Sequence, residues 1–349
     1  MKRFLTLGLV LIFSYGTAQD QNPPNIILMI GDGMGLTQIT AGMYAQGNTT
    51  VLEQFEAVGL AKTHAHEQLV TDSAASGTAM ACGEKTYNGV LGINPKNERL
   101  ESILEYAQTQ GYLSALLATS SIVHATPAAF YANVDSRKKY QEIALQMSES
   151  KVDYFIGGGR THFTTREDNR NLIEEMRDYD IVNSLKKFEK STASKIGFFT
   201  DEEEPKPIAQ GRYPDLDEMV NATLDKLATK NKPFFMMVEG SQIDWGGHAN
   251  ELNYVLSEFK DFDKAVAAVL AFAKKQGNTL VIVTADHETG GFSLLKGSVE
   301  KSSVSGKYST TGHSAAMVPV FAYGPGAASF SGIYENTSIF KKMKVLIPE

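Results

Sequence analysis

Six continuous apolar runs constrain the fold of this 349-residue chain more than any other feature. Each run has the length and composition of a strand that is buried on both faces, and helical patterns lie between the runs. The strands are predicted at 25–30, 112–119, 153–158, 233–240, 279–286 and 318–324. The helices are predicted at about 98–110, 137–149, 170–178, 215–230, 251–275 and 336–344. This alternation predicts an α/β fold, a three-layer sandwich in which helices cover both faces of a mostly parallel central sheet.

The first residues, MKRFLTLGLVLIFSYGTAQD, have the composition of an export signal. Two basic residues precede an apolar stretch of about ten residues, and small residues follow, as in cleavable secretory signals. A short buried helix is the alternative. We predict a signal peptide over 1–18, a single domain over 19–349, and export to the periplasm or the medium. No later segment reaches the ~20 apolar residues of a membrane span.

Charge and cysteine content exclude several classes of function. The net charge of -7 and the pI of about 5.6 argue against a nucleic-acid-binding protein, so an anionic substrate would need local positive charge, which metal ions can supply. With Cys82 alone, an internal disulfide and a thiolate metal cluster are excluded. The less regular stretches 160–214 and 290–312 are predicted to be reduced surface insertions on the single domain.

Three apolar runs lead directly into acid-rich segments: NIILMI into GDGMG, FFMMVEG into SQIDWGGH, and TLVIVTA into DHETGG. Ligands of open α/β sheets bind at the carboxyl ends of the strands, so we expect these segments to meet at one place. Asp32, between glycines, suits a metal ion, although it is equally suited to cap the next helix. Asp286 and His287 can both face a metal only if the chain turns at the strand end, and otherwise they lie in a solvated loop.

Glu239, Asp244 and His248 fall within a span of ten residues after one of these strands. A carboxylate and an imidazole four positions apart are a normal pair of zinc ligands. The alternative is that Glu239 caps the strand end and His248 opens the next helix. His313, in TTGHSAAMVPV, is an unremarkable loop histidine by itself, and it gains weight only as a third ligand for this pair.

The segment VHATPAAFYANVDSRKKY offers a different kind of ligand. Thr126 lies before Pro127, which disfavours helical backbone at the threonine, and a threonine hydroxyl suits a hard cation such as magnesium. Arg137 offers a planar fork to phosphate. The alternative for Arg137 is a solvated face that it shares with Lys138 and Lys139.

The small-residue stretch TDSAASGTAMACG, residues 71–83, is the candidate for a nucleophile. Read alone, it leaves the nucleophile open, and a tightly packed helix start explains it equally well. Its candidate side chains are Thr71, Ser73, Ser76, Thr78 and Cys82.

Taken together and in order, these segments resemble the alkaline phosphatase family over about residues 25 to 326. The resemblance rests on NIILMIGDGMG, TDSAASGTAMACG, HATPAAFYANVDSR, FFMMVEGSQIDWGGH, VIVTADHETGG and TGHSAAMVPVFAYGPG. It implies an alkaline-phosphatase-like fold and the hydrolysis of small-molecule phosphate monoesters with two zinc ions (Zn2+) and one magnesium ion (Mg2+). Homodimers are common in the family, but the short segment between TADHETGG and His313, where longer relatives carry an insertion at the dimer interface, leaves a homodimer open here.

The resemblance also implies roles for individual residues. Ser73 would be the nucleophile, transiently phosphorylated and activated by a zinc ion, with Asp72 orienting it and Arg137 clamping two phosphate oxygens. The first zinc site would comprise Asp244, His248 and His313. The second zinc site would comprise Asp32, Asp286, His287 and Ser73. The magnesium site would comprise Asp32, Thr126 and Glu239.

His124 and Trp245, around the magnesium site and the phosphate, stand at positions that vary within the family. The resemblance implies that Trp245 in place of a lysine weakens the retention of phosphate. A phosphodiesterase or another phosphate-transfer member of the same superfamily is the alternative function. An exported metal-binding protein that has lost catalysis is a third, and the presence of Ser73 and Arg137 argues against it.

Overall fold

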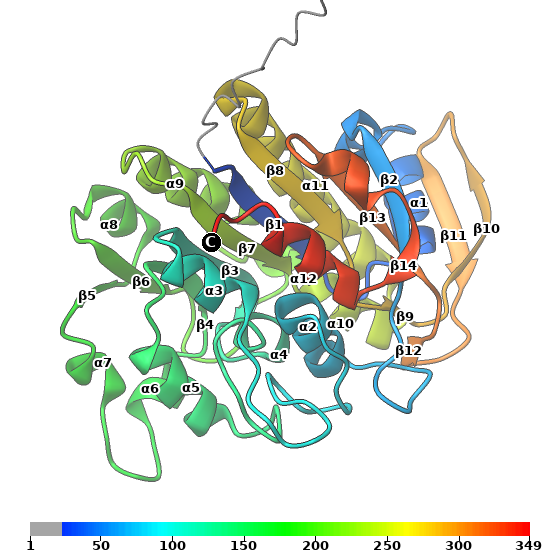
Figure 1. Cartoon of the computed structure of the whole chain (residues 1–349). Helices are drawn as coiled ribbons and strands as arrows, with labels where there is room; N and C mark the ends of the chain where they lie inside the picture. The colour runs from blue at the N-terminus through cyan, green and yellow to red at the C-terminus, as the bar shows by residue number, and fades with distance from the viewer. Residues whose placement is uncertain (1–22) are drawn as a thin grey trace, which may run out of the picture.

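The structure is a computed structural model that describes residues 23–349, so the predicted signal peptide over 1–18 lies outside the described residues. Its centre is a ten-stranded sheet in the order β14-β2-β13-β8-β1-β7-β3-β4-β6-β5 (Figure 1). All six apolar runs form strands of this sheet. They are β1 (Asn25–Gly31), β3 (Leu113–Ser121), β4 (Tyr154–Gly158), β7 (Phe234–Gly240), β8 (Thr279–Thr284) and β13 (Val318–Tyr323).

The direction of one strand differs from the prediction. From β8 to β5 every neighbouring pair is parallel, whereas β13 runs antiparallel to both of its neighbours, β8 and β2. Residues 318–324 were expected to be a parallel strand because an apolar run carries no information about direction. Beyond β13 lie two strands that the sequence did not reveal, β2 (Ala57–Lys62) and β14 (Gly332–Glu335).

Helices cover both faces of the sheet, as predicted (Figure 1). One face is contacted by α9 and α11, and the other by α3 and α4, with α2 and α12 packed beside them. Every predicted helical segment contains a helix, although the one at 170–178 is reduced to a single turn, α7. The helices are α1 (Leu36–Ala45), α2 (Ser73–Cys82), α3 (Ile103–Thr109), α4 (Ala125–Ala128), α5 (Tyr140–Glu149), α6 (Thr161–Thr164), α7 (Leu172–Glu175), α8 (Leu185–Lys190), α9 (Leu216–Ala228), α10 (Gln242–His248), α11 (Leu252–Gln276) and α12 (Thr337–Lys344), and the 3-10 helices are η1 (Val51–Gln54), η2 (Ile208–Gln210) and η3 (Ala327–Phe330).

The two irregular segments have different structures. Residues 160–214 are more than a surface insertion, because β5 (Tyr179–Val182) and β6 (Lys195–Phe199) extend the central sheet at one end. Residues 290–312 form a separate hairpin of β10 (Ser293–Ser298) and β11 (Ser303–Lys307), which contacts α1 at the opposite side of the molecule (Figure 1). Two short strands flank this hairpin and pair with each other, β9 (Glu288–Thr289) and β12 (His313–Ser314).

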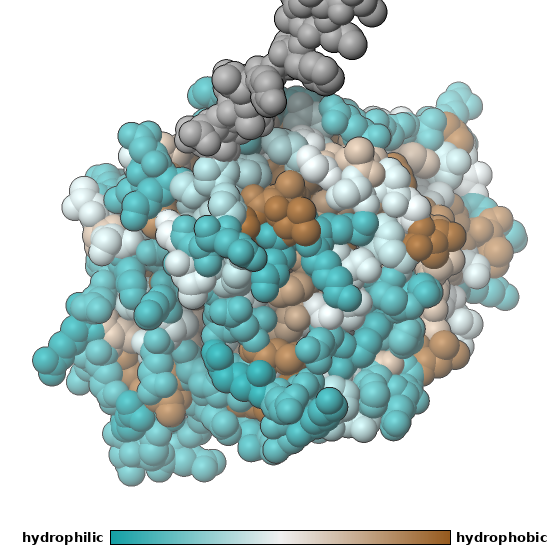
Figure 2. Space-filling model, in the orientation of Figure 1, coloured by the Kyte–Doolittle hydropathy of each residue, from teal (hydrophilic) through white to brown (hydrophobic). Residues whose placement is uncertain are grey.

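The surface agrees with the charged composition. Figure 2 shows a mostly hydrophilic face on which the apolar patches are small and separate from one another. Within residues 23–349, no helix combines the length and the apolar character that a bilayer crossing requires.

Candidate active site and metal centre

The carboxyl ends of neighbouring strands bring the predicted ligands together. Asp32 follows β1, Glu239 is the penultimate residue of β7, and Asp286 and His287 follow β8. All four side chains are fully buried. His313 lies in the short strand β12, five residues before β13 begins. Because β13 is antiparallel to β8, it starts at the edge where the parallel strands end, and this places His313 beside their ligands.

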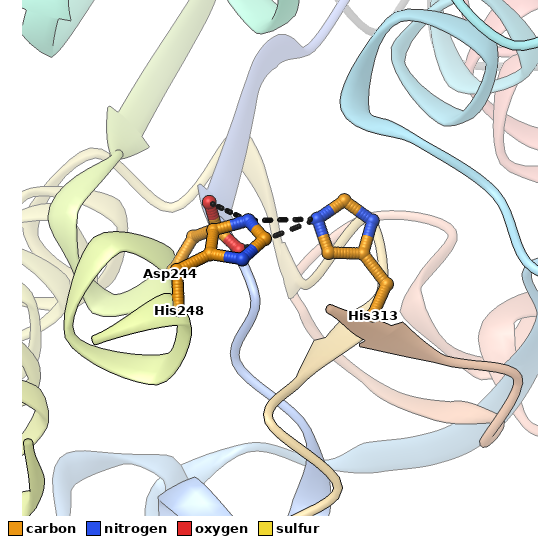
Figure 3. A group of neighbouring side chains, drawn as sticks. All are labelled: Asp244, His248 and His313. Carbon is orange, nitrogen blue, oxygen red and sulfur yellow. Dashed lines mark hydrogen bonds and ion pairs between the residues drawn. The ribbon is translucent and has the colours of Figure 1, made fainter. Parts of the chain in front are cut away.

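Asp244, His248 and His313 form the first cluster (Figure 3). His248 Nε2 lies 3.3 Å from Asp244 Oδ2, and His313 Nε2 lies 3.6 Å from Asp244 Oδ1. The two Nε2 atoms are 3.1 Å apart. The hydrogen bond to Asp244 raises the pKa of His248 to about 9, so the two side chains form an ion pair. A bound zinc ion would take the place of the proton between them.

The other ring nitrogen of each histidine is held by a neighbouring oxygen. His248 Nδ1 lies 2.5 Å from the carbonyl of Thr311, and His313 Nδ1 lies 2.7 Å from the carbonyl of Thr71. In the neutral ring, an Nδ1–H that donates to a carbonyl leaves Nε2 unprotonated, which is the arrangement typical of zinc-bound histidine. Both histidines are therefore oriented as ligands by the backbone of distant segments.

The second cluster surrounds His287. Its Nε2 lies 3.1 Å from Asp286 Oδ2, 3.6 Å from Asp32 Oδ1 and 3.4 Å from Ser73 Oγ. The other carboxylate oxygen of Asp286 accepts a hydrogen bond from the backbone N–H of Gly33 at 3.1 Å, which turns Oδ2 toward the cluster. All four side chains predicted for the second zinc site thus converge.

The third cluster lies between β7 and the end of β3. Carboxylate oxygens of Asp32 and Glu239 approach a ring nitrogen of His124 to within 4.8 Å. Glu239 Oε2 accepts hydrogen bonds from Ser241 Oγ at 2.7 Å and from Ser120 Oγ at 3.3 Å. Its Oε1 and the hydroxyl of Thr126 make none, so oxygen atoms that suit magnesium remain available.

Buried carboxylate oxygens without a hydrogen bond indicate whether the carboxyl edge of the sheet fits metal ions. Neither carboxylate oxygen of the fully buried Asp32 makes a hydrogen bond. Burial, together with the charges of Asp286, Asp244 and Glu239, raises the pKa of Asp32 well above its usual value, and burial raises the pKa of Glu239 to about 7. Buried carboxylates normally have a charged partner or hydrogen-bond donors, and no Lys or Arg forms an ion pair with Asp32 or Glu239 in residues 23–349. The donor set therefore fits cations, and Asp32 belongs to both the second and the third cluster.

Ser73 is the first residue of α2, and the N-cap before it is Asp72. Asp72 Oδ1 accepts a hydrogen bond from Ala75 N at 2.9 Å, and its Oδ2 accepts one from Arg137 Nη1 at 3.1 Å. One carboxylate thus fixes both the start of the helix and the guanidinium. The free N–H groups of a helix N-terminus and a fixed guanidinium are suited to phosphate.

The two predicted outer positions are also neighbours. His124 Nε2 lies 3.3 Å from Arg137 Nη2, and the ring of His124 meets that of Trp245 edge to face with centroids 6.2 Å apart. Two of the other nucleophile candidates, Ser76 and Cys82, lie in different surroundings. Ser76 Oγ donates to the carbonyl of Asp286 at 2.7 Å, and Cys82 is buried at the far end of α2 with its pKa raised by burial.

Several residues that support the ligands did not stand out in the sequence. The hydroxyl of Thr289 donates to Asp244 Oδ1 and lies 3.2 Å from His287 Nδ1, so it connects a ligand of the first cluster to a ligand of the second. Ser120 and Ser241 support Glu239 in the same way. Each lies next to or within a predicted motif, but single hydroxyl residues carry no signal of their own.

A mostly parallel α/β sheet with this set of carboxylate, imidazole and hydroxyl donors at its carboxyl edge is typical of metal-dependent hydrolases. Comparison with known proteins agrees: a family profile described as Alkaline phosphatase matches residues 24–307 and 295–348. The chain belongs to the alkaline phosphatase family.

Individual relatives cover nearly the whole chain. Alkaline phosphatase 4 of Bacillus subtilis (strain 168) is 34% identical, with 92% of this chain and 88% of the relative aligned. The solved structure of alkaline phosphatase from the Antarctic bacterium TAB5 is 42% identical and superposes with a TM-score of 0.88, over 94% of this chain and 99% of that chain. A TAB5 variant with a histidine changed to aspartate, solved with Mg bound in its M3 site, has the same identity, coverage and TM-score.

Proposed function

We propose that the protein hydrolyses phosphate monoesters through a phosphoserine intermediate on Ser73, with two zinc ions and one magnesium ion bound at the sheet edge. The observation that carries the proposal is the position of Ser73 Oγ, 3.4 Å from His287 Nε2 at the N-terminus of α2, beside three clusters of buried donors. Asp244, His248 and His313 would hold the first zinc ion, and Asp32, Asp286 and His287 the second. Asp32, Thr126 and Glu239 would hold magnesium.

When bound, the metal ions would supply positive charge that lowers the pKa of a hydroxyl or a water and stabilises the oxygens of the phosphoryl group. Ser73 Oγ attacks phosphorus and gives up its proton, and the bond to the alcohol oxygen breaks, so the phosphoryl group passes to the serine and the leaving oxygen takes up a proton and departs as the alcohol. Arg137, held by Asp72, donates to two non-bridging oxygens throughout. Water then attacks the phosphoserine, which releases inorganic phosphate and restores the hydroxyl of Ser73.

A serine is a weak nucleophile at its ordinary pKa and needs activation. In phosphoryl transfer most of the catalysis comes from positioning the reacting groups and from stabilising charge. His287 Nε2 faces both carboxylates of the second cluster, so the ring serves as a ligand rather than as the base for Ser73. His124 and Trp245 border the phosphate position and shape its outer contacts.

Trapping the intermediate tests the proposal. After incubation with labelled phosphate ester and an acid quench, label is expected on the peptide that contains Ser73, and Ser73→Ala should abolish both the label and turnover. Ser76→Ala, one turn further along the same helix, is the matched control and should keep the label. Label on another residue would overturn the proposed nucleophile.

The choice between a monoesterase and a diesterase needs a second measurement. An aryl phosphate monoester and the corresponding diester, compared at equal concentration, should show a preference for the monoester. Faster turnover of the diester would favour the alternative function. Export is a separate proposal: a protein secreted by the cell and starting at residue 19 on N-terminal sequencing would support cleavage after Ala18.

A further inference from the structure

Glu288 is a buried carboxylate that the mechanism does not use. It follows His287 directly, is 4% exposed, and forms no ion pair with Lys, Arg or His within the part of the chain that the structure describes. Its Oε1 accepts hydrogen bonds from Gln38 Nε2 at 2.7 Å and from Phe292 N at 3.0 Å. Its Oε2 accepts a hydrogen bond from Gly291 N at 3.1 Å and another from Ser314 Oγ.

These partners belong to three segments that carry metal ligands. Gln38 lies on α1, which the GDGMG turn of Asp32 leads into, and Ser314 is the residue after His313. The Cα atoms of Glu288 and Ser314 are partners in the β9–β12 pair. The Glu288 carboxylate thus connects α1, which follows the turn of Asp32, to β12, which carries His313.

The packing around Glu288 shows the same connection. A Cβ atom on Gly35 would lie 2.3 Å from Glu288 Cγ, so the glycine that ends GDGMG leaves the space that the Glu288 side chain occupies. Gln38 Nε2 also donates to the carbonyl of Thr289 at 2.8 Å. Four donors converge on the carboxylate, and only a group that accepts at both oxygens satisfies all of them.

Resting on the function proposed above, we propose that Glu288 is a positioning residue: it holds the loop of His313 against the loop of Asp286 and His287 and so sets the geometry of the first zinc site relative to the second. Its carboxylate contacts neither substrate nor metal. Its effect passes through His313. Among residues 23–349, the His313 ring has one hydrogen bond outside the cluster, from Nδ1 to the carbonyl of Thr71.

Zinc binding, measured separately from activity, tests this role. Competition with a chromophoric chelator yields the dissociation constants of the two zinc sites. Glu288→Ala, and the isosteric Glu288→Gln in case the alanine variant does not fold, should weaken the first zinc site by about 10-fold, the lower end of the effect of losing a direct partner of a ligand, because Glu288 acts on His313 through its neighbour Ser314. Ser314→Ala, which removes one of the four donors, should weaken the same site by less.

Asp263→Asn is the matched control. Asp263 is likewise buried without a cation, and its Oδ1 accepts hydrogen bonds from Thr50 Oγ1 at 2.7 Å and Val51 N at 3.2 Å, away from the metal segments. Unfolding in urea should show comparable losses of stability for the control and for Glu288→Gln, whereas zinc affinity should fall only in the latter.

The outcomes separate this inference from the proposed function. If the wild-type protein binds two zinc ions and the Glu288 variants bind them as tightly as the Asp263 control, the positioning role is overturned and the function stands. If the wild-type protein binds no zinc, the proposed function fails before Glu288 is tested. Selective weakening of one zinc site supports both.

Discussion

Two regions of the molecule bury carboxylates, and they differ in whether the chain itself supplies the partners of those carboxylates. On α11, Glu258 and Asp261 both accept hydrogen bonds from Arg212 Nη2, at 2.7 Å and 2.8 Å, and all three side chains are 2–3% exposed. Backbone N–H groups complete this cluster, since Ile208 N donates to Glu258 and Leu216 N to Asp261. Each charge therefore has its partner within the chain.

At the sheet edge the chain supplies only part of the counter-charge, from the imidazoles of His248 and His287, and no Lys or Arg of the described residues pairs with the carboxylates of the three clusters there. Both oxygens of Asp32 and one oxygen of Glu239 make no hydrogen bond. Three further ligand atoms, on His124, Asp244 and His287, lie within 4.8 Å of an Asp32 oxygen. A buried anion with unpaired oxygens is costly, and such groups cluster at functional sites. The comparison teaches that the Arg212 cluster is closed by partners within the chain, whereas the sheet edge has unpaired oxygens that fit the cations of the proposed function.

Removal of metal should have the largest effect, and only at the sheet edge. Prolonged treatment with a chelator is expected to reduce phosphatase activity to background, with recovery on addition of Zn2+ and Mg2+. Loss of ligands present at 1,000 times their Kd would also cost about 4 kcal/mol of stability per site. Calorimetry with and without chelator measures this, and an unchanged unfolding temperature would contradict the comparison.

Arg212→Met should produce the opposite pattern. Removing one partner of a buried ion pair leaves the other charge uncompensated, at a cost of about 3–5 kcal/mol in the free energy of unfolding. Urea unfolding measures the loss, while kcat per folded molecule and zinc content should be unchanged. A fall in zinc content at a temperature where the variant is folded would show that the two regions are coupled.

The pH dependence of stability sharpens the comparison further. Burial, opposed by Arg212, raises the pKa of Asp261 from 3.8 to about 6. A raised folded-state pKa means that the folded protein binds this proton more tightly. The contribution of this proton to the free energy of unfolding is therefore fully present below about pH 4. It is lost as the pH rises through 6, a change of roughly 2–3 kcal/mol.

The difference in unfolding free energy between wild type and Asp261→Asn isolates this contribution, because the metal ligands are common to both proteins. The advantage of wild type over the variant should be greatest at pH 4 and smaller at pH 7. A difference that is independent of pH would mean that Asp261 titrates normally.

Glu239→Gln should have the smallest effect, and its sign should depend on metal. In chelator-treated protein the neutral amide avoids a buried, partly unpaired charge, so the variant should be more stable than wild type by about 1 kcal/mol. In protein loaded with Mg2+ the order should reverse, because a carboxylate is the better ligand. Glu258→Gln, whose carboxylate is paired with Arg212, is the control and should be destabilised under both conditions.

Much of the fold was predictable because it rests on local patterns. Apolar runs located six strands, and every predicted helical segment contains a helix. The strand β5 was missed because it is short and only Val182 in it is buried. The strand β6 is as long as β4 and almost as buried, so its missed assignment is not explained by length or burial; its run KIGFF lies in a stretch that looked like an irregular insertion. The antiparallel direction of β13 was missed because direction depends on connections and not on composition.

The sequence by itself determined which residues are available for chemistry. The motifs around Ser73, Asp32, Asp244 and Asp286 are dense in metal ligands, and their order along the chain is that of the alkaline phosphatase family. Residue type and local spacing carry this information, since ligands must be carboxylates, imidazoles or hydroxyls wherever they are placed.

Only the tertiary structure decided how these residues meet. His313 reaches His248, 65 positions away, because β13 enters the sheet in the reverse direction, and Glu288 acquires its role from Gln38 and Ser314. The physical reason is that a hydrogen bond or a ligand distance is set by the approach of separate strands and loops. Such approaches depend on the packing of the whole sheet, which no single stretch of sequence encodes.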